Sequence, residues 1–330
     1  MIEIINTSVD PYFNLALEEY AIKEMDPKDD LFILWQDEPT VVVGRNQNTL
    51  EEINRDYIKQ NNIHVVRRLS GGGAVYHDSG NLNFTFIVSE KQTTGFNFTR
   101  FTRPVIKALE ELGINAEDNG RNDITIKGKK FSGNAQFRYH QRTLHHGTIL
   151  FDSNLDDVSS ALNANPEKII SKGVKSVRSR VTNISEWLAE PLSIYAFKNI
   201  LNDTILREEE YVEKHYLTEA DLAAVNSLRE SRYFRWEWNY GSSPPFNIQK
   251  TARFKWGNID IRLLIKKGRI LTCKIYGDFF ASRDITGLEN SLRGVFYKEE
   301  EIGALLNQID IKTYLPAAET GEIIGLLFKL

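Results

Sequence analysis

The densest group of residues able to do chemistry is a glycine run behind two arginines, Arg67-Arg68-Leu69-Ser70-Gly71-Gly72-Gly73. Glycines carry no Cβ, so a ligand can lie directly on their backbone, and successive N–H groups can form an anion-binding nest. Arginine adds a planar, charged fork for phosphate or carboxylate oxygens. Apolar segments flank the run and His77-Asp78 follows it, which favours a ligand site over a solvated hairpin loop.

This run matches neither of the common nucleotide motifs. It lacks the Gly-Lys-Ser/Thr ending and the following helix of a Walker loop, and the missing helix also excludes a dinucleotide fingerprint. A serine hydrolase is unsupported because the sequence has no Gly-x-Ser-x-Gly elbow. No paired-carboxylate motif stands out for glycoside chemistry.

A second group surrounds Lys130. Residues 121–150 hold six Lys or Arg and one acid, so their charge is 6 − 1 = +5 in a chain whose net charge is −4. Such a concentration suits an anionic ligand. Alternation along a strand predicts that Lys130 and Ser132 share one face, with Lys129 and Phe131 on the other. Lys129 fits a solvated edge strand, whereas Lys130 precedes small residues, Ser132 to Ala135, that let a ligand approach.

Two more groups are less specific. His145 and His146 are neighbours on a predicted strand, so they point to opposite faces and do not make a paired metal site. For His146 a structural role and a ligand role are equally supported, and for His145 a structural role or an exposed position is favoured. The stretch Ser171–Asn183 carries four basic residues and no acid, which fits either a solvated linker or a lid over a phosphate.

Local patterns predict the elements that position these groups. Asp10-Pro11 opens a helix, Thr49 starts one that reaches about Asn61, and another spans about 104–112. Apolar runs and alternation predict the strands 31–35, 40–43, 64–68, 74–77, 82–88, 123–126, 129–137 and 143–151. Turn residues 78–81 join 74–77 and 82–88 into a hairpin. Residues 154–163 and 191–232 are predicted to be helical.

The chain is long enough for two domains. Trp236–Pro245 is the best linker candidate, which predicts domains of residues 1–245 and 246–330. The second has strands at 246–256, 258–265 and 269–276 and helices at 284–292, 298–308 and 318–328. Cys273 is the single cysteine and fits a small core residue. With no disulfide possible, no signal peptide and no long apolar span, we expect a cytoplasmic protein that does not bind a membrane. The net charge of −4 argues against a globally basic nucleic-acid binder, so we expect no nucleic-acid partner.

The chain resembles the lipoate–protein ligases over nearly its full length. The resemblance rests on RRLSGGGAVYHD (67–78), GNLN (80–83), GRNDI (120–124), KFSGNAQ (130–136), HGT (146–148) and SVRSRVTN (176–183). It implies an α+β fold. The large domain has a mixed or antiparallel sheet flanked by helices, as in biotin protein ligases and class II tRNA synthetases, and a small C-terminal α+β accessory domain follows.

The resemblance implies a two-step reaction in which lipoate and ATP, with Mg²⁺, form lipoyl-AMP, and the lipoyl group then passes to an acceptor lysine. Lys130 is the implied catalytic residue, and Asp123 is an implied magnesium ligand. The nucleotide or adenylate site is implied to include Arg68, Gly73, Ala74, Val75, Tyr76, Asn122, Asp123, Lys130, Arg178 and Asn183. The lipoate site is implied to include Ser70, Gly71, Gly72, Lys130, Ser132, Gly133 and His146.

The implied acceptors are lipoyl domains of 2-oxo-acid dehydrogenase acyltransferase subunits, the glycine-cleavage carrier protein, or both. Octanoate is a plausible alternative acid, because an apolar slot distinguishes weakly between similar tails. One alternative activity is ATP-independent octanoyl or lipoyl transfer between carrier proteins, against which the lack of a cysteine in residues 1–245 counts. Biotin ligation and a non-catalytic lipoate sensor fit less well, since RRLSGGG replaces the biotin-ligase loop and both Lys130 and Asp123 are present.

Overall fold

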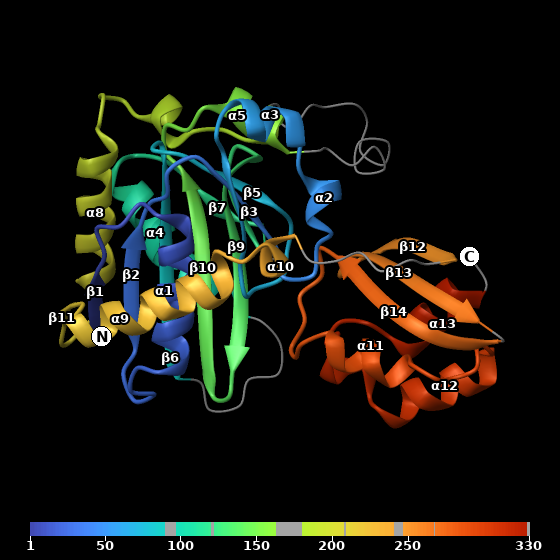
Figure 1. Ribbon diagram of the computed structural model, residues 1–330. Coiled ribbons are helices and arrows are strands. Elements are labelled where there is room, and N and C mark those ends of the chain that lie inside the picture. Colours follow the sequence, from blue (N-terminus) through green and yellow to red (C-terminus); the bar gives the residue numbers. More distant parts are fainter. Residues whose placement is uncertain are drawn as a thin grey trace. The chain divides into compact units, whose positions relative to one another are not determined.

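The computed structural model describes residues 1–89, 97–119, 122–162, 180–207, 209–240, 247–266 and 268–328. The chain forms two compact units (Figure 1). The larger comprises Met1–Val43, Leu50–Arg68 and Ala74–Asn239, and the smaller comprises Gly44–Thr49, Leu69–Gly73 and Tyr240–Leu330. The smaller unit therefore includes two short segments from the first 73 residues, and a division of the chain at residue 245 stays a prediction.

An eight-stranded mixed sheet is the centre of the larger unit, in the order β11-β1-β2-β6-β10-β9-β8-β7. The strands β1 and β2, and β1 and β11, run parallel, whereas the pairs from β2 to β7 are antiparallel. The predicted α+β fold class is confirmed. The strands are β1 Ile2–Ile5, β2 Leu31–Trp35, β6 Asn81–Ser89, β7 Glu117–Asp118, β8 Asp123–Ile126, β9 Lys129–Tyr139, β10 Arg142–Leu150 and β11 Glu213–Tyr216.

Successive side chains of a strand point to opposite faces of the sheet. Apolar side chains lie on both faces here, and helices cover each face. Phe84 and Phe86 of β6 pack in a core with residues of α4 (Thr99–Glu111) and α8 (Ile194–Leu206). Ile87 of β6 packs on the other face with residues of α1 (Pro11–Lys23) and α9 (Glu219–Leu228). We call this second side of the sheet the α1 face.

A second sheet carries the residues that flank the glycine run. Its order is β4-β3-β5, with β3 Thr40–Val43 between β4 His64–Arg67 and β5 Val75–His77. The predicted hairpin of residues 74–88 is therefore wrong, because β5 pairs with β3 whereas β6 pairs with β2 and β10. The turn at 78–81 connects two sheets instead of two neighbouring strands.

Several predicted helix bounds change for local reasons. The helix predicted from Thr49 to Asn61 is two helices, α2 Thr49–Glu52 and α3 Arg55–Gln60, because Asn54 caps the second one by accepting the Tyr57 N–H. The helix α4 begins at Thr99, ahead of the predicted start at 104. The predicted helical stretch 191–232 also contains β11, an exposed edge strand with no apolar alternation. Further short helices are α5 Leu155–Ala161 and α10 Trp236–Asn239.

The C-terminal part of the smaller unit is a three-stranded antiparallel sheet with helices, as predicted. Its elements are β12 Ile248–Phe254, β13 Gly257–Lys266, β14 Arg269–Gly277, α11 Thr286–Leu292, α12 Glu299–Gln308 and α13 Thr320–Phe328. Cys273 lies in this core, and burial raises the pKa of its thiol to about 12. It is thus a core residue, as expected. Among the helices of the described residues, none has the length and apolarity to cross a membrane.

Candidate active site

A row of five cross-strand partners crosses the α1 face of the main sheet. Residues that pair directly across antiparallel strands share one face of the sheet. The register places these five side by side on β2, β6, β10, β9 and β8: Trp35, Asn83, Thr148, Gly133 and Asp123. Lys130 pairs with Thr125, two residues along β8 from Asp123, and so faces the same side.

A β-bulge brings Lys130 to this face. Between β8 and β9, Ile124 pairs with Ser132 but Thr125 pairs with Lys130, which leaves Phe131 as the extra residue. The expectation that Lys130 and Ser132 share a face is therefore wrong. The Ser132 hydroxyl accepts a hydrogen bond from Asn134 on the opposite face, where Phe131 is buried in the core. A ligand on the Lys130 side can contact only the backbone of Ser132.

The ammonium group of Lys130 lies beside a carboxylate and above a glycine. Its Nζ is 2.7 Å from Oδ1 of Asp123, and the two side chains are 35% and 27% exposed. A Cβ on Gly133 would lie 2.8 Å from this Nζ. The positive charge is thus held in place, accessible to solvent, above a stretch of sheet without a side chain. Such a group can stabilise negative charge that develops on a bound substrate.

The backbone of Lys130 also anchors the segment that follows the basic stretch. The Thr182 N–H donates to the Lys130 carbonyl at 3.0 Å, and Val181 forms an isolated bridge with Lys130. Next to it, Asn183 uses both ends of its amide on Ser153: it accepts from the Ser153 N–H at 3.0 Å and donates to the Ser153 carbonyl at 2.8 Å. Arg178 and the rest of residues 171–179 lie outside the described residues.

Arg68, predicted to contact the nucleotide, is buried directly after the end of β4. Its Nη1 donates to the Val42 carbonyl at 3.1 Å. Burial lowers the pKa of its guanidinium to about 10, an effect that the nearby Glu18 opposes. Arg67 has a different role, because it donates to the carbonyls of Trp238 and Asn239 and thereby fixes α10.

The glycine run belongs to the smaller unit, where its backbone is closely packed. A Cβ on Gly71 would lie 2.3 Å from the Phe279 carbonyl oxygen. Gly72 has a φ of +91°, a conformation that side chains disfavour. The carbonyl of the buried Ser70 accepts from the Arg45 N–H at 2.8 Å. A Cβ on Gly73 would meet no atom within 4 Å.

The residues after the glycine run lead into β5. Ala74 is half-buried, Val75 packs against the core of the α1 face, and Tyr76 is buried toward the other side of the small sheet. Burial and the nearby Asp157 raise the pKa of the Tyr76 hydroxyl well above its usual range.

His146 belongs to a buried polar chain on the α1 face. Its Nδ1 lies 3.0 Å from both carboxylate oxygens of Glu18, and one of these, Oε1, also accepts from the Thr85 hydroxyl at 2.5 Å. Thr85 in turn accepts from Trp35 Nε1 at 2.9 Å. His145 on the opposite face stacks on Phe101, and burial lowers its pKa well below the usual range. Of the two positions expected for His145, structural or exposed, the buried structural one is found.

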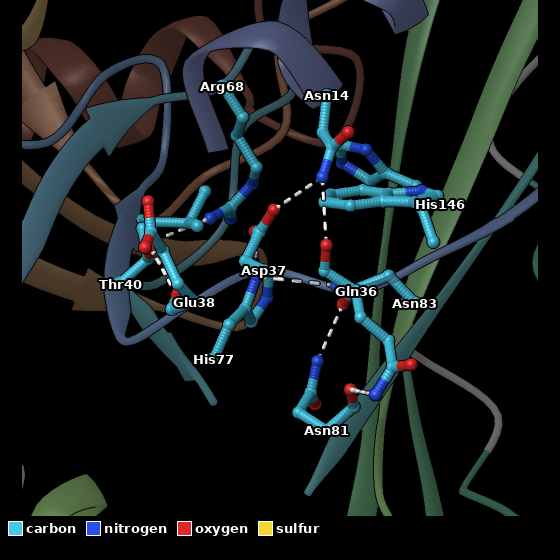
Figure 2. Close-up of polar contacts among 12 residues, drawn as sticks. Asn14, Gln36, Asp37, Glu38, Thr40, Arg68, His77, Asn81, Asn83 and His146 are labelled. Carbon is cyan, nitrogen blue, oxygen red and sulfur yellow. Dashed lines mark hydrogen bonds and ion pairs between the residues drawn. The ribbon is translucent and has the colours of Figure 1, made fainter. Parts of the chain in front are cut away.

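A second buried polar cluster lies beside the row, around Asp37 (Figure 2). Its Oδ2 is 2.7 Å from His77 Nδ1, and its Oδ1 accepts from Asn14 at 2.8 Å. Neither Asp37 nor Glu18 is singled out by the sequence. Asp37 follows a strand in a turn-like Gln-Asp-Glu-Pro, and Glu18 lies within a helix, where a carboxylate is ordinary. For Asp37, the one available signal is the His77-Asp78 motif, which lies 40 residues later in the sequence.

The acidic groups of the site do not form a metal cage by themselves. Among the described residues, no three His, Cys, Asp or Glu side chains converge as metal ligands would. Asn122, next to Asp123, is bound to β9: its carbonyl accepts from the Asn134 N–H at 2.8 Å. Asp123 is thus one accessible carboxylate beside Lys130.

Sequence comparisons place the whole chain in one group of proteins. The model of the lipoyl protein ligase A/B catalytic domain matches residues 10–206, and that of the bacterial lipoate protein ligase C-terminus matches residues 243–327. A lipoate-protein ligase of Bacillus subtilis is 45% identical over 331 residues, which cover 99% of this chain and 100% of that protein.

Solved structures agree in fold. The lipoate complex of LipL1 from P. falciparum has a TM-score of 0.80 at 24% identity and covers 100% of this chain and 99% of its own. A bi-partite lipoate protein ligase from Thermoplasma acidophilum, studied with its E2 lipoyl domain, has a TM-score of 0.64 at 28% identity, covering 75% and 98%. A lipoate-protein ligase A bound with ATP has a TM-score of 0.62 at 27% identity, covering 73% and 98%.

Proposed function

The chain belongs to the lipoate–protein ligase family, and on that premise we propose that it is an ATP-dependent enzyme that attaches lipoate to an acceptor lysine. In the first step a lipoate carboxylate oxygen attacks the α-phosphorus of ATP, and pyrophosphate leaves. In the second step the lysine ε-amine attacks the carbonyl carbon of lipoyl-AMP. AMP then leaves, and the nitrogen loses a proton as the amide forms.

The observation that carries this proposal is the Lys130 ammonium, held 2.7 Å from Asp123 above the side-chain-free Gly133. Both steps pass through a centre that gathers negative charge, first at phosphorus and then at the carbonyl oxygen. A fixed cation that a substrate can reach stabilises both. Lys130 therefore acts as an electrophile in this mechanism, with the two substrate anions bound beside it.

The remaining predicted residues have different roles in this proposal. Within the larger unit, Arg68 and the backbone from Ala74 to Tyr76 are assigned to the nucleotide, and His146 is assigned to the lipoate. The roles of Ser70–Gly73, which belong to the smaller unit, stay predictions. Asn183 acts by holding the segment beside Lys130, because its amide is used on Ser153. Arg178 stays a prediction.

The donor set fits a cation that arrives with the nucleotide. Mg²⁺ is commonly bound through one or two protein carboxylates plus substrate phosphates, and Asp123 offers one carboxylate that is 27% exposed. Bound there, Mg²⁺ would neutralise phosphate charge. Asp123 also orients Lys130, so it would contribute to the binding of Mg²⁺ and to the position of the Lys130 ammonium.

The partners that we propose are lipoyl-acceptor domains of 2-oxo-acid dehydrogenase acyltransferase subunits or the glycine-cleavage carrier protein, in the cytoplasm. The Thermoplasma relative studied with an E2 lipoyl domain supports the first of these. An apolar slot would accept octanoate as well as lipoate.

A direct test incubates the protein with an apo lipoyl domain, lipoate, Mg²⁺ and ATP. Mass spectrometry of the domain and assay of AMP then follow the reaction. We expect the lipoyl adduct on one lysine, AMP in equal amount, and no adduct without ATP.

The competing activity is transfer from an octanoylated carrier domain without ATP. Transfer under those conditions, with no adduct from free lipoate and ATP, would contradict the proposal. The only cysteine, Cys273, is buried in the smaller unit, which disfavours a thioester route.

A further inference from the structure

Asp37 and His77 form a buried acid–imidazole pair that no step of the proposed reaction uses. Asp37 Oδ2 and His77 Nδ1 are 2.7 Å apart, and their side chains are 0% and 3% exposed. Burial raises the pKa of Asp37, and the hydrogen bond from His77 opposes that shift. Removing one partner of such a pair leaves a buried polar group unpaired, which is costly. The pair therefore stabilises whatever arrangement brings its two residues together.

The pair joins elements from two sheets and a helix. His77 belongs to β5 of the small sheet, and Asp37 lies in the connection between β2 and β3. Asn14 of α1 donates to Asp37 at 2.8 Å, and the amide nitrogen of Asn83, on β6 of the main sheet, lies 3.4 Å from His77 Nδ1 (Figure 2). The short strand β5 is thus held at its last residue by Asp37 of the β2–β3 connection, which Asn14 of the covering helix in turn binds.

The strand held in this way follows directly on the glycine run. It consists of three residues, Val75–His77, and pairs only with β3 among the described residues. Its backbone includes Val75 and Tyr76, which the proposed function places against the nucleotide. A three-residue strand has few hydrogen bonds of its own, so its position depends on the contacts at its ends.

The distance along the row indicates that the pair does not act on the reacting atoms directly. Asn83, next to His77, is separated from Gly133 by the two strand spacings β6–β10 and β10–β9, or about 10 Å. Lys130 Nζ lies over Gly133. An imidazole that far from the ammonium influences the chemistry through the backbone that it holds.

We propose that Asp37 and His77 are positioning residues, which fix β5 against the main sheet and so set the Val75–Tyr76 backbone for nucleotide binding. The nucleotide part of this statement rests on the proposed function, whereas the anchoring of β5 does not.

The test compares His77→Asn with His77→Leu in the full-length protein. Asparagine keeps an N–H near the place of Nδ1–H and can still donate to Asp37, whereas leucine leaves the buried carboxylate unpaired. Amide hydrogen exchange of a peptide covering residues 75–77 is measured without ligands. The KM for ATP is measured in lipoate-dependent ATP–pyrophosphate exchange.

We expect His77→Leu to accelerate amide exchange roughly tenfold or more and to raise the KM for ATP at least fivefold. We expect His77→Asn to stay within about threefold of the wild type in both.

His215→Leu is the matched control. His215 Nε2 lies 3.0 Å from Asp221 Oδ2, a second acid–imidazole pair in the larger unit, at the β11 end of the main sheet. This variant should lose stability but keep the wild-type KM for ATP and the wild-type amide exchange at 75–77.

Two results would overturn the inference. Wild-type amide exchange at 75–77 in His77→Leu would show that the pair does not anchor β5. Loss of activity in His77→Asn with wild-type amide exchange would show that Nε2 acts directly. This atom is buried and has no hydrogen-bond partner among the described residues. If His77→Leu does not fold, Asp37→Asn replaces it, with faster amide exchange at 75–77 as the result required. If the wild type itself shows no pyrophosphate exchange, the proposed function fails while the amide measurement still decides the anchoring.

Discussion

The position of Lys130 depends on a neighbour that has no side chain. Gly133 lies three residues later on the same strand, and the bulge at Phe131 turns both residues toward the α1 face. The ammonium group occupies the space where a Cβ would project. Asp123, paired with Gly133 across the strands, then holds the charge at 2.7 Å.

Gly133→Ala should therefore reduce activity without reducing stability. The new methyl would lie 2.8 Å from Nζ and 3.0 Å from Cε of Lys130, both at the flexible end of a side chain that can move away. We expect lipoate-dependent pyrophosphate exchange to fall roughly 10- to 1,000-fold, in line with the loss of one preorganised electrostatic contact. The free energy of unfolding should stay the same or rise by about 0.5–1 kcal/mol, because alanine orders more easily than glycine in a strand.

The matched control is Gly325→Ala in α13, where a Cβ would meet no atom within 4 Å. It should stabilise the protein by about 1 kcal/mol and leave exchange unchanged. Wild-type exchange in Gly133→Ala would contradict the role given to this glycine.

At the scale of elements, the sequence predicts the strands well and their neighbours poorly. The bounds of β2, β3 and β8 match the prediction because each is a continuous or alternating apolar run. The pairing of β5 with β3 could not be inferred, because the turn at 78–81 suits a hairpin as well as a crossover between sheets. The bulge at Phe131 has no local signal in the sequence either. Strict alternation therefore places Ser132 on the face of Lys130, whereas its side chain lies on the opposite face.

Asn183, predicted to contact the adenylate, also makes a contact within the fold. Its amide binds the Ser153 backbone at both ends, and its side chain is buried. Asn183→Ala leaves a buried N–H and a buried carbonyl unpaired, so it should lower the free energy of unfolding by about 2–4 kcal/mol. Urea denaturation measures this loss. A loss under about 0.5 kcal/mol for the alanine variant would contradict the structural role.

At the scale of the whole molecule, stability at high pH depends on a contact between α1 and α9. The Tyr20 hydroxyl donates to Asp221 at 2.5 Å, and this hydrogen bond is the main reason why the pKa of Tyr20 is raised to about 12. Burial alone would raise the pKa of Asp221. The hydrogen bonds from Tyr20, Thr218 and His215 nevertheless lower it below the usual range.

The folded protein therefore keeps the Tyr20 proton at a pH where the unfolded chain, with a tyrosine pKa near 10, has lost it. The contribution of this contact is complete below about pH 10 and disappears as the pH rises toward 12. Tyr20→Phe should be less stable than the wild type at pH 8, and the difference should shrink between pH 10 and 12. Thermal unfolding across this range measures it, and a difference that is constant with pH would contradict the assignment.

Which segments belong to each of the two units could not be predicted from the sequence, because the contacts that decide it join residues far apart in the chain. The C-terminal sheet and its helices follow from local patterns, but the inclusion of Gly44–Thr49 and Leu69–Gly73 in the smaller unit does not. Only contacts such as Gly71 against the Phe279 carbonyl reveal it. The residues of the glycine run predict a ligand loop, whereas the surroundings that require glycine at Gly71 depend on Phe279, about 200 positions later.

Lipoate-dependent ATP–pyrophosphate exchange, measured side by side for the wild type and for Lys130→Ala, tests the role of Lys130 most directly. Circular dichroism and thermal unfolding confirm that both are folded. Because Lys130 is proposed to supply the fixed positive charge of the adenylation step, exchange should be present in the wild type and fall by roughly 100-fold or more in the variant. Robust exchange in a folded Lys130→Ala protein would remove Lys130 from the centre of the mechanism. Its absence from the wild type, with lipoate still bound, would contradict ATP-dependent ligation itself.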